Sequence, residues 1–88
     1  VSASELLAVA RCESGPNLNA VGKAGEYGLF QYMPQTWRNF NKEAKLFDRP
    51  DINNPDQQIE LTAWAWSKGY KKHWTCWRMI PNENLREM

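Results

Sequence analysis

The segment Arg11-Cys12-Glu13-Ser14-Gly15-Pro16 decides the fold around it, because it ends a helix directly after an acidic residue. Upstream of this segment, apolar side chains repeat at helical spacing at Leu6, Val9 and Ala10. The Ser-x-x-Glu pattern of residues 2–5 is a capping box, which is typical of a helix start. Glycine followed by proline is typical of a helix end. The sequence therefore predicts a helix over residues 3–13.

Glu13 occupies the next position on this apolar stripe. A carboxyl group on the core side of a helix is disfavoured as the anion, so burial raises its pKa and lets it hold a proton near neutral pH. A general acid needs that property. The alternative is an exposed glutamate in the last helical turn, since glutamate is seldom buried. Position on the helix alone leaves both interpretations open.

Two further motifs follow this glutamate along the chain. Gly-Leu-Phe-Gln stands at residues 28–31 and Pro-Gln-Thr-Trp at residues 34–37. Together with the Glu-Ser pair at residues 13–14, they resemble the lysozyme-like lytic transglycosylase family, which includes goose-type lysozymes and resuscitation-promoting factors. The resemblance runs over residues 6–77 and implies an all-α, lysozyme-like helical domain with a substrate cleft.

The resemblance assigns the chemistry to Glu13, because the glutamate of the Glu-Ser pair is the catalytic acid of that family. The implied substrate is peptidoglycan, cleaved at the β-1,4 bond between N-acetylmuramic acid and N-acetylglucosamine. The family's Gly-Leu-Met-Gln segment lines the cleft, and this chain has Phe30 in place of the methionine. The family's Ala-Tyr-Asn-x-Gly segment faces the site from a later helix. Residues 65–69 stand in its place, where Trp66 and Ser67 replace a phenol and an amide.

The loop before residues 28–31 is expected to bring further groups to Glu13. Its glycines permit backbone conformations closed to other residues, which lets the chain turn back over the helix end. The Gln31 amide offers a donor and an acceptor to a sugar, or else satisfies the loop backbone. Trp66 offers a ring on which a sugar stacks, or else belongs to the core. The candidate substrate-binding residues are Ser14, Tyr27, Gln31, Tyr32 and Trp66.

A second acid would decide the type of reaction. Glycoside hydrolysis usually uses two carboxylates, and Glu26 is the acidic residue within the cleft loop. If Glu26 activates water, the enzyme is a hydrolytic lysozyme. Lytic transglycosylases, which this chain resembles, use one glutamate as acid and then as base, and the C6 hydroxyl of muramic acid attacks the anomeric carbon. Outside the enzymes, the alternative is a non-catalytic glycan-binding or structural cell-wall module.

A chain of 88 residues makes one domain, expected here over residues 1–88, and a core of this size is only marginally stable. Its two cysteines, Cys12 and Cys76, can supply a covalent link. Given the small size and the extracellular substrate that the resemblance implies, we expect a disulfide, which the loop-entropy model values at about 4 kcal/mol. Two free buried thiols are the alternative.

Composition argues against several other classes of protein. The net charge of +1 does not suit a general nucleic-acid binder, and no apolar run approaches the length of about 18 residues needed for a membrane span. The two cysteines and the single histidine lack the paired spacing of zinc sites, so we expect no metal and no cofactor. We expect a monomer that is secreted, periplasmic or associated with the cell wall. Because the chain opens on Val1, we expect that a targeting segment has been removed.

Two more helices are predicted downstream. Pro34 suits the first turn of one of them. Asn54 and Pro55 give the other an N-cap and a first helical residue, and we expect it to end at Gly69. This last helix should be the central one, with Trp64 on its polar arc as a surface for a sugar ring. Most of its circumference is apolar, with Leu61 and Ala65 on one side and a second side formed by Ile59, Ala63, Trp66 and Tyr70.

Overall fold

The computed structural model describes residues 2–79, which form helices joined by loops. In chain order these are α1 (Ala3–Ser14), α2 (Pro34–Ala44), α3 (Pro55–Ser67), the short 3-10 helix η1 (Lys71–His73) and α4 (Thr75–Met79). Within the described part of the chain, strand pairing is limited to two isolated bridges, Val21 with Tyr27 and Tyr27 with Tyr32. The prediction of an all-α fold is confirmed.

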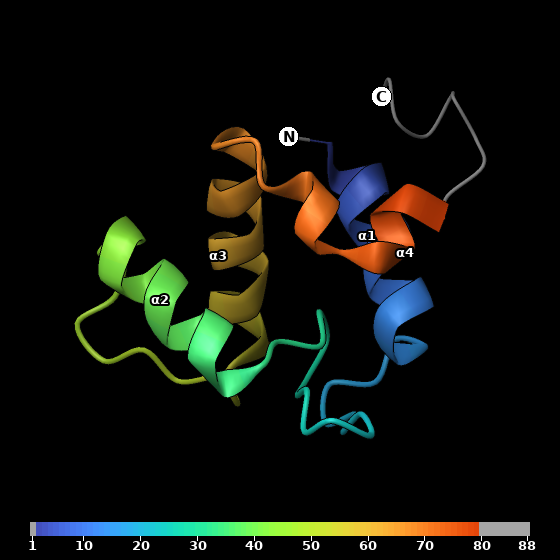
Figure 1. The fold of residues 1–88 in the computed structure, drawn as a ribbon, viewed down its shortest axis with the longest axis horizontal. Coiled ribbons are helices and arrows are strands. Elements are labelled where there is room, and N and C mark those ends of the chain that lie inside the picture. The colour runs from blue at the N-terminus through green and yellow to red at the C-terminus, as the bar shows by residue number, and fades with distance from the viewer. Residues whose placement is uncertain (1, 80–88) are drawn as a thin grey trace.

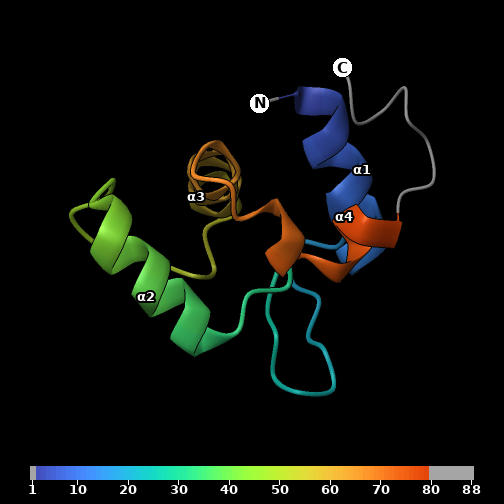
Figure 2. The same ribbon diagram turned by 45° about the horizontal axis from the view of Figure 1, so that its top comes forward.

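The helices are arranged around α3, which packs against α2 on one side and α1 on the other (Figures 1 and 2). After α3 the chain returns through η1, so that α4 lies against α1. The long loop between α1 and α2 lies at one end of the molecule, below α1 in Figure 1. The first helix and the loop that follows it therefore meet the last described segment, which is far from both in the sequence.

The helices begin and end close to where local signals predict. The Ser2 side chain accepts a hydrogen bond from the Glu5 backbone nitrogen at 3.4 Å, and Gly15 ends α1 with a φ of 88°. The helix α2 begins at its predicted proline. At the start of α3 the Asn54 side chain accepts from the backbone nitrogen of Gln57 at 3.2 Å. These contacts satisfy amide groups that the helices themselves leave unpaired.

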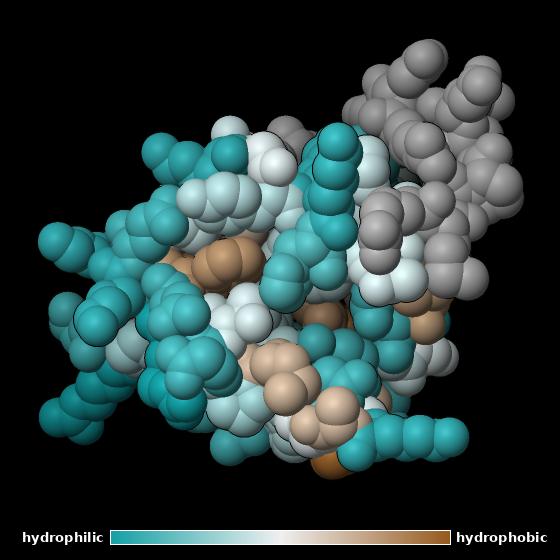
Figure 3. All heavy atoms as spheres, in the orientation of Figure 1, coloured by the Kyte–Doolittle hydropathy of each residue, from teal (hydrophilic) through white to brown (hydrophobic). Residues whose placement is uncertain are grey.

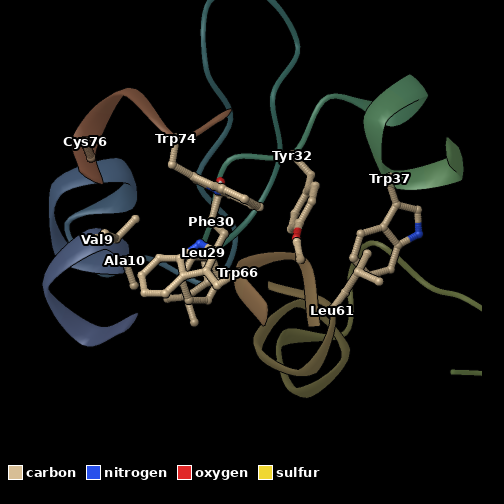
Figure 4. Close-up of a cluster of buried hydrophobic side chains, with 11 residues drawn as sticks. Val9, Ala10, Leu29, Phe30, Tyr32, Trp37, Leu61, Trp66, Trp74 and Cys76 are labelled. Carbon is tan, nitrogen blue, oxygen red and sulfur yellow. The ribbon is translucent and has the colours of Figure 1, made fainter. Parts of the chain in front are cut away.

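An aromatic core lies between the helices, with Tyr32 at its centre (Figure 4). The Tyr32 ring meets the ring of Trp37 edge-on at a centroid distance of 5.2 Å, and that of Trp74 at 5.6 Å. Its side chain is 1% exposed, and its hydroxyl shares a 2.8 Å hydrogen bond with Thr62. Burial raises the pKa of Tyr32, so the phenol stays neutral and acts as a core group with one satisfied polar atom.

The buried face of α3 agrees only in part with the predicted apolar sides. Ile59 is 40% exposed and Ala63 is only partly buried. The buried residues of this helix are Gln58, Leu61, Thr62, Ala65 and Trp66. Leu61, Ala65 and Trp66 are buried as their apolar positions predicted, but the sequence did not place the two polar residues inside. Gln58 and Thr62 are buried at little cost since each is hydrogen-bonded inside the core.

Trp64 is not the free sugar surface that the sequence suggested. Its ring lies 6.0 Å from that of Phe40 on α2 and 6.0 Å from that of Tyr70 after α3. Such edge-on contacts are typical of packed aromatic side chains. Trp64 therefore belongs to the interface that holds α3 against α2.

A disulfide joins Cys12 of α1 to Cys76 of α4, so the expected disulfide is confirmed. On the face of the molecule shown in Figure 3, polar side chains predominate and apolar ones emerge as separate small areas. Across residues 2–79, none of the helices has the length and apolar character that crossing a membrane requires.

Candidate active site

Glu13 lies in the last turn of α1, where its half-buried side chain lines a pocket of about 190 Å³. The pocket forms where the end of α1, the α1–α2 loop and the junction of η1 with α4 meet. Its lining residues are Glu13, Glu26, Gln31, Tyr32, Met33, His73, Trp74 and Thr75. Two other hollows, of about 200 and 510 Å³, have no carboxylate among their lining residues. The pocket at Glu13 is therefore the candidate for acid–base chemistry.

The surroundings of Glu13 raise the pKa of its carboxyl group from the ordinary value of 4.5. Loss of hydration by burial is the largest cause. The backbone nitrogen of Cys76 lies 3.4 Å from Oε2 and donates a hydrogen bond that favours the anion, which lowers the pKa. The negative charge of Glu26 disfavours the anion and raises the pKa. Among residues 2–79, no lysine, arginine or histidine forms an ion pair with Glu13. These features support the half-buried interpretation over the exposed one.

Glu26 lies in the same pocket as Glu13, as the sequence suggested. Its Oε1 accepts a hydrogen bond from the backbone nitrogen of Ala24 at 2.8 Å. A Cβ atom on Gly22 would come within 2.5 Å of the Glu26 carboxyl group. A glycine at this position therefore leaves room for the Glu26 side chain. The loop thus holds a second carboxylate beside the first.

The loop that carries these residues is fixed to α3 by Gln58, which sequence reasoning missed. Gln58 is 1% exposed, and its Oε1 accepts from the Phe30 backbone nitrogen at 2.9 Å. Its Nε2 donates to the carbonyl oxygens of Tyr27 and Ile52 at 3.1 and 2.8 Å. A Cβ on Gly28, which has a φ of 84°, would collide with this amide. The helical spacing of Gln58 from Leu61, Thr62 and Ala65 is a signal that could have placed it inside.

Gln31 lines the pocket, but its amide nitrogen already has backbone partners. Nε2 donates to the carbonyl oxygens of Ala20 at 3.1 Å and Gly28 at 2.8 Å. The loop-stabilising role that the sequence left open is therefore present. The backbone of Gln31 also has a φ of 50°, which is uncommon for a residue with a side chain and lets the chain reverse direction here.

Ser14 and Tyr27 lie outside the set of residues that line the pocket. The Ser14 hydroxyl donates to the carbonyl oxygen of Ala10 at 2.8 Å and accepts from the Asn17 backbone nitrogen at 3.2 Å. The Tyr27 hydroxyl donates to Asn19 at 3.2 Å. Both side chains order the chain after α1, and their contact with substrate stays a prediction.

Trp66 lies in the core, with 4% of its surface exposed. Its ring is 6.4 Å from that of Trp74, and Lys71 Nζ lies 5.4 Å from its centroid. Figure 4 shows it among the buried apolar side chains below Phe30. Because a sugar needs an exposed ring face on which to stack, this placement corrects the expectation that Trp66 contacts substrate.

The later segment that does reach the pocket is residues 73–75, which sequence reasoning did not place there. The His73 ring lies 5.2 Å from that of Trp74 and 5.6 Å from that of Phe40. Partial burial lowers the pKa of His73, so its imidazole is neutral at pH 7 and can both donate and accept a hydrogen bond. Trp74 is anchored by a 3.0 Å hydrogen bond from Nε1 to the Phe30 carbonyl oxygen.

A family model described as the transglycosylase SLT domain matches residues 1–80 of the chain. The matched range contains the end of α1, the cleft loop and residues 73–75, and so includes every residue that lines the pocket. No curated protein and no solved structure matches the chain.

Proposed function

Because the chain belongs to the transglycosylase SLT domain family, which acts on peptidoglycan, we propose that it is a peptidoglycan lytic transglycosylase with Glu13 as its catalytic acid and base. The proposed bond is the β-1,4 link between N-acetylmuramic acid and N-acetylglucosamine. The proposed enzyme acts as a monomer outside the cytoplasm, where this substrate is found.

In the first proposed step, the protonated Glu13 carboxyl group gives its proton to the glycosidic oxygen as the bond from that oxygen to the anomeric carbon breaks. Glu13 is then an anion beside an electron-poor sugar. In the second step it removes the proton from the C6 hydroxyl of the same muramic acid, and that oxygen bonds to the anomeric carbon. The product is a 1,6-anhydro sugar, and Glu13 is protonated again. Attack within one sugar has a small entropic cost.

The observation that carries this proposal is the environment of Glu13. A carboxyl group that lines an open pocket, is half-buried and has no cationic partner among residues 2–79 is suited to hold a proton at the pH where most carboxyl groups have lost theirs. The Cys76 amide gives the anion some stabilisation, which the second step requires. The same group can therefore serve in both steps.

The other polar groups of the pocket are proposed to bind the sugar. Gln31 retains its side-chain oxygen as an acceptor for a hydroxyl or N-acetyl group, beyond the two bonds that its nitrogen makes. His73 and Thr75 add a neutral imidazole and a hydroxyl to the lining of the same pocket. Ser14 and Tyr27 are proposed to act by ordering the loop beside these residues.

Hydrolysis is the second candidate reaction, and the presence of Glu26 in the pocket favours it. A carboxylate there could activate water for attack on the anomeric carbon, which would leave a reducing sugar. The family relationship favours transglycosylation, for which the C6 hydroxyl replaces the water.

Mass spectrometry of the fragments released from purified peptidoglycan tests the proposal. Transglycosylation predicts muropeptides that carry the 1,6-anhydro group, about 18 Da lighter than hydrated fragments because no external water is added. Predominantly reducing ends would identify a hydrolase instead. The Glu13→Gln variant is the matched control, since it removes the transferable proton and keeps the shape. If neither the wild type nor this variant releases fragments, the remaining interpretation is a glycan-binding module without catalytic activity.

A further inference from the structure

The disulfide lies directly beside the proposed catalytic carboxyl group. Cys12 precedes Glu13 in the last turns of α1, and Cys76 lies in α4, 64 residues later in the chain. The Cα atoms of the two cysteines are 5.8 Å apart. Figures 1 and 2 both show α4 against α1 at this point. The covalent link therefore joins the helix that carries Glu13 to the segment that carries the pocket residues Trp74 and Thr75.

The same cysteine that forms the disulfide also contacts the carboxylate through its backbone. The Cys76 nitrogen donates to Glu13 Oε2 at 3.4 Å, while the two residues before it, Trp74 and Thr75, line the pocket. The acceptor residue, Glu13, follows Cys12 in the sequence, and the donor is Cys76 itself. Fixing the two sulfur atoms thus restricts the distance between donor and acceptor.

The disulfide is not the sole connection between α1 and the segment that follows α3. At the opposite end of α1, the Glu5 carboxylate accepts hydrogen bonds from Lys71 Nζ at 3.2 Å and from Trp77 Nε1 at 3.1 Å. Trp74 is also tied to Phe30 through its indole nitrogen. These contacts also hold the two segments together, but none of them includes Glu13 or Cys76 themselves.

The Cys76 amide matters electrostatically because the other neighbours of Glu13 do not favour the anion. Burial disfavours it, and the charge of Glu26 in the loop repels it. His73, from η1, faces the same pocket as a neutral imidazole. A hydrogen bond to a charged acceptor contributes more than one between neutral groups. Small changes in the position of this amide should therefore change the balance between the two forms of Glu13.

We propose that the Cys12–Cys76 disulfide is a positioning element for the reaction, which holds the Cys76 amide on the Glu13 carboxylate, in addition to stabilising the fold. This inference rests on the proposed role of Glu13. It assigns to the disulfide a share in turnover that is separable from its effect on stability.

The test compares two variants that each remove one tie between α1 and the later segment. Cys12→Ser with Cys76→Ser removes the tie at Glu13, and Glu5→Gln weakens the tie at the other end. Both are assayed well below their unfolding temperatures, with circular dichroism to show that they are folded. The Glu13 carboxyl group is titrated by carbon NMR, and kcat and KM are measured on soluble peptidoglycan fragments.

The expected result is a raised Glu13 pKa in the double serine variant, with a kcat lowered on the order of tenfold, as for the loss of one hydrogen bond to a charged group, and little change in KM. In Glu5→Gln the titration of Glu13 and the kcat should be unchanged, although the protein is less stable. Equal titrations of Glu13 in the wild type and the folded double serine variant would overturn the inference. Failure of the proposed function would instead appear as an absence of cleavage by the wild type.

A second measurement needs no folded cysteine variant. In the wild-type protein, the amide proton resonance of Cys76 should shift as Glu13 titrates, because that proton is donated to its carboxylate. In Glu13→Gln this shift should disappear. A Cys76 amide that does not respond to the ionisation of Glu13 would overturn the inference by itself.

Discussion

Each end of α1 carries a glutamate that contacts the segment after α3, and the two carboxyl groups have different partners there. Glu5, in the first turn, is 3% exposed and accepts hydrogen bonds from Lys71 and Trp77. Glu13, in the last turn, faces an open pocket and has one backbone amide as a donor and Glu26 as a charged neighbour. The same side chain on the same helix therefore meets a cation at one end and a like charge at the other.

This difference separates a structural glutamate from a chemical one. A buried carboxylate that accepts hydrogen bonds from a cation and an indole N–H ties elements of the fold together. A carboxyl group that lacks a cation keeps its proton to higher pH and can donate it to a substrate. Exposure to the pocket then gives a substrate access to Glu13, which Glu5 does not offer.

The largest expected effect is at Glu13. Glu13→Gln should lower turnover by at least about a hundredfold, because the amide cannot transfer the proton on which general acid–base catalysis depends. Loss of turbidity of a peptidoglycan suspension measures the rate. Circular dichroism should show a wild-type fold. Turnover within a few-fold of the wild type would remove Glu13 from the mechanism.

The same chemical change at the other end of α1 should act on stability. Glu5→Gln should lower the free energy of unfolding by about 1–2 kcal/mol, since Lys71 and Trp77 lose a charged acceptor but Lys71 is partly exposed and can regain water. Denaturant unfolding measures this loss. Activity per folded molecule should stay the same, and a folded but inactive Glu5→Gln protein would contradict the division between the two glutamates.

A smaller effect is expected at Glu26. If the C6 hydroxyl of muramic acid is the nucleophile, Glu26→Gln should change turnover only a few-fold, because its role is limited to the field at Glu13. The products should remain 1,6-anhydro fragments. If Glu26 activates water, the same change should lower turnover by roughly a hundredfold or more, as for loss of a general base. That second outcome, together with reducing ends, would replace transglycosylation by hydrolysis.

The smallest expected effect concerns the dependence of stability on pH. The pKa of Glu13 is raised on folding, so its favourable contribution to stability is fully present below 4.5 and is lost as pH rises through the folded-state pKa. Glu13→Gln cannot ionise and avoids this loss. Its unfolding temperature, relative to the wild type, should therefore increase between pH 4 and pH 7. A difference that stays constant or falls over this range would contradict the raised pKa.

Local signals were sufficient for the helix bounds and for part of the site. Ser2 and Gly15 mark the ends of α1, and Asn54 marks the start of α3, because capping depends on residues a few positions apart. Glu13 and Glu26 share a pocket, as expected from the turn that the loop makes. These parts of the structure depend on neighbours in the sequence.

The parts that were missed depend on contacts between distant residues. Gln58 is buried because groups from the loop, 28 and 31 residues away, complete its hydrogen bonds. His73 and Thr75 reach the pocket because the disulfide and Trp74 bring their segment back to α1 and the loop. Hydropathy also could not distinguish Trp66, in the core, from an indole at the cleft. A single sequence does not show which distant residues each side chain contacts, so these placements could not be predicted from it.

The central claim is that Glu13 holds a proton in the range where an ordinary glutamate has lost it. Carbon NMR titration of the wild-type Glu13 carboxyl group, assigned by comparison with Glu13→Gln, tests this claim most directly. We predict a midpoint above 4.5, and a fall in peptidoglycan cleavage at the pH where this carboxyl group loses its proton. A midpoint at or below 4.5 would contradict the claim, because Glu13 would then be ionised before it could act as the acid.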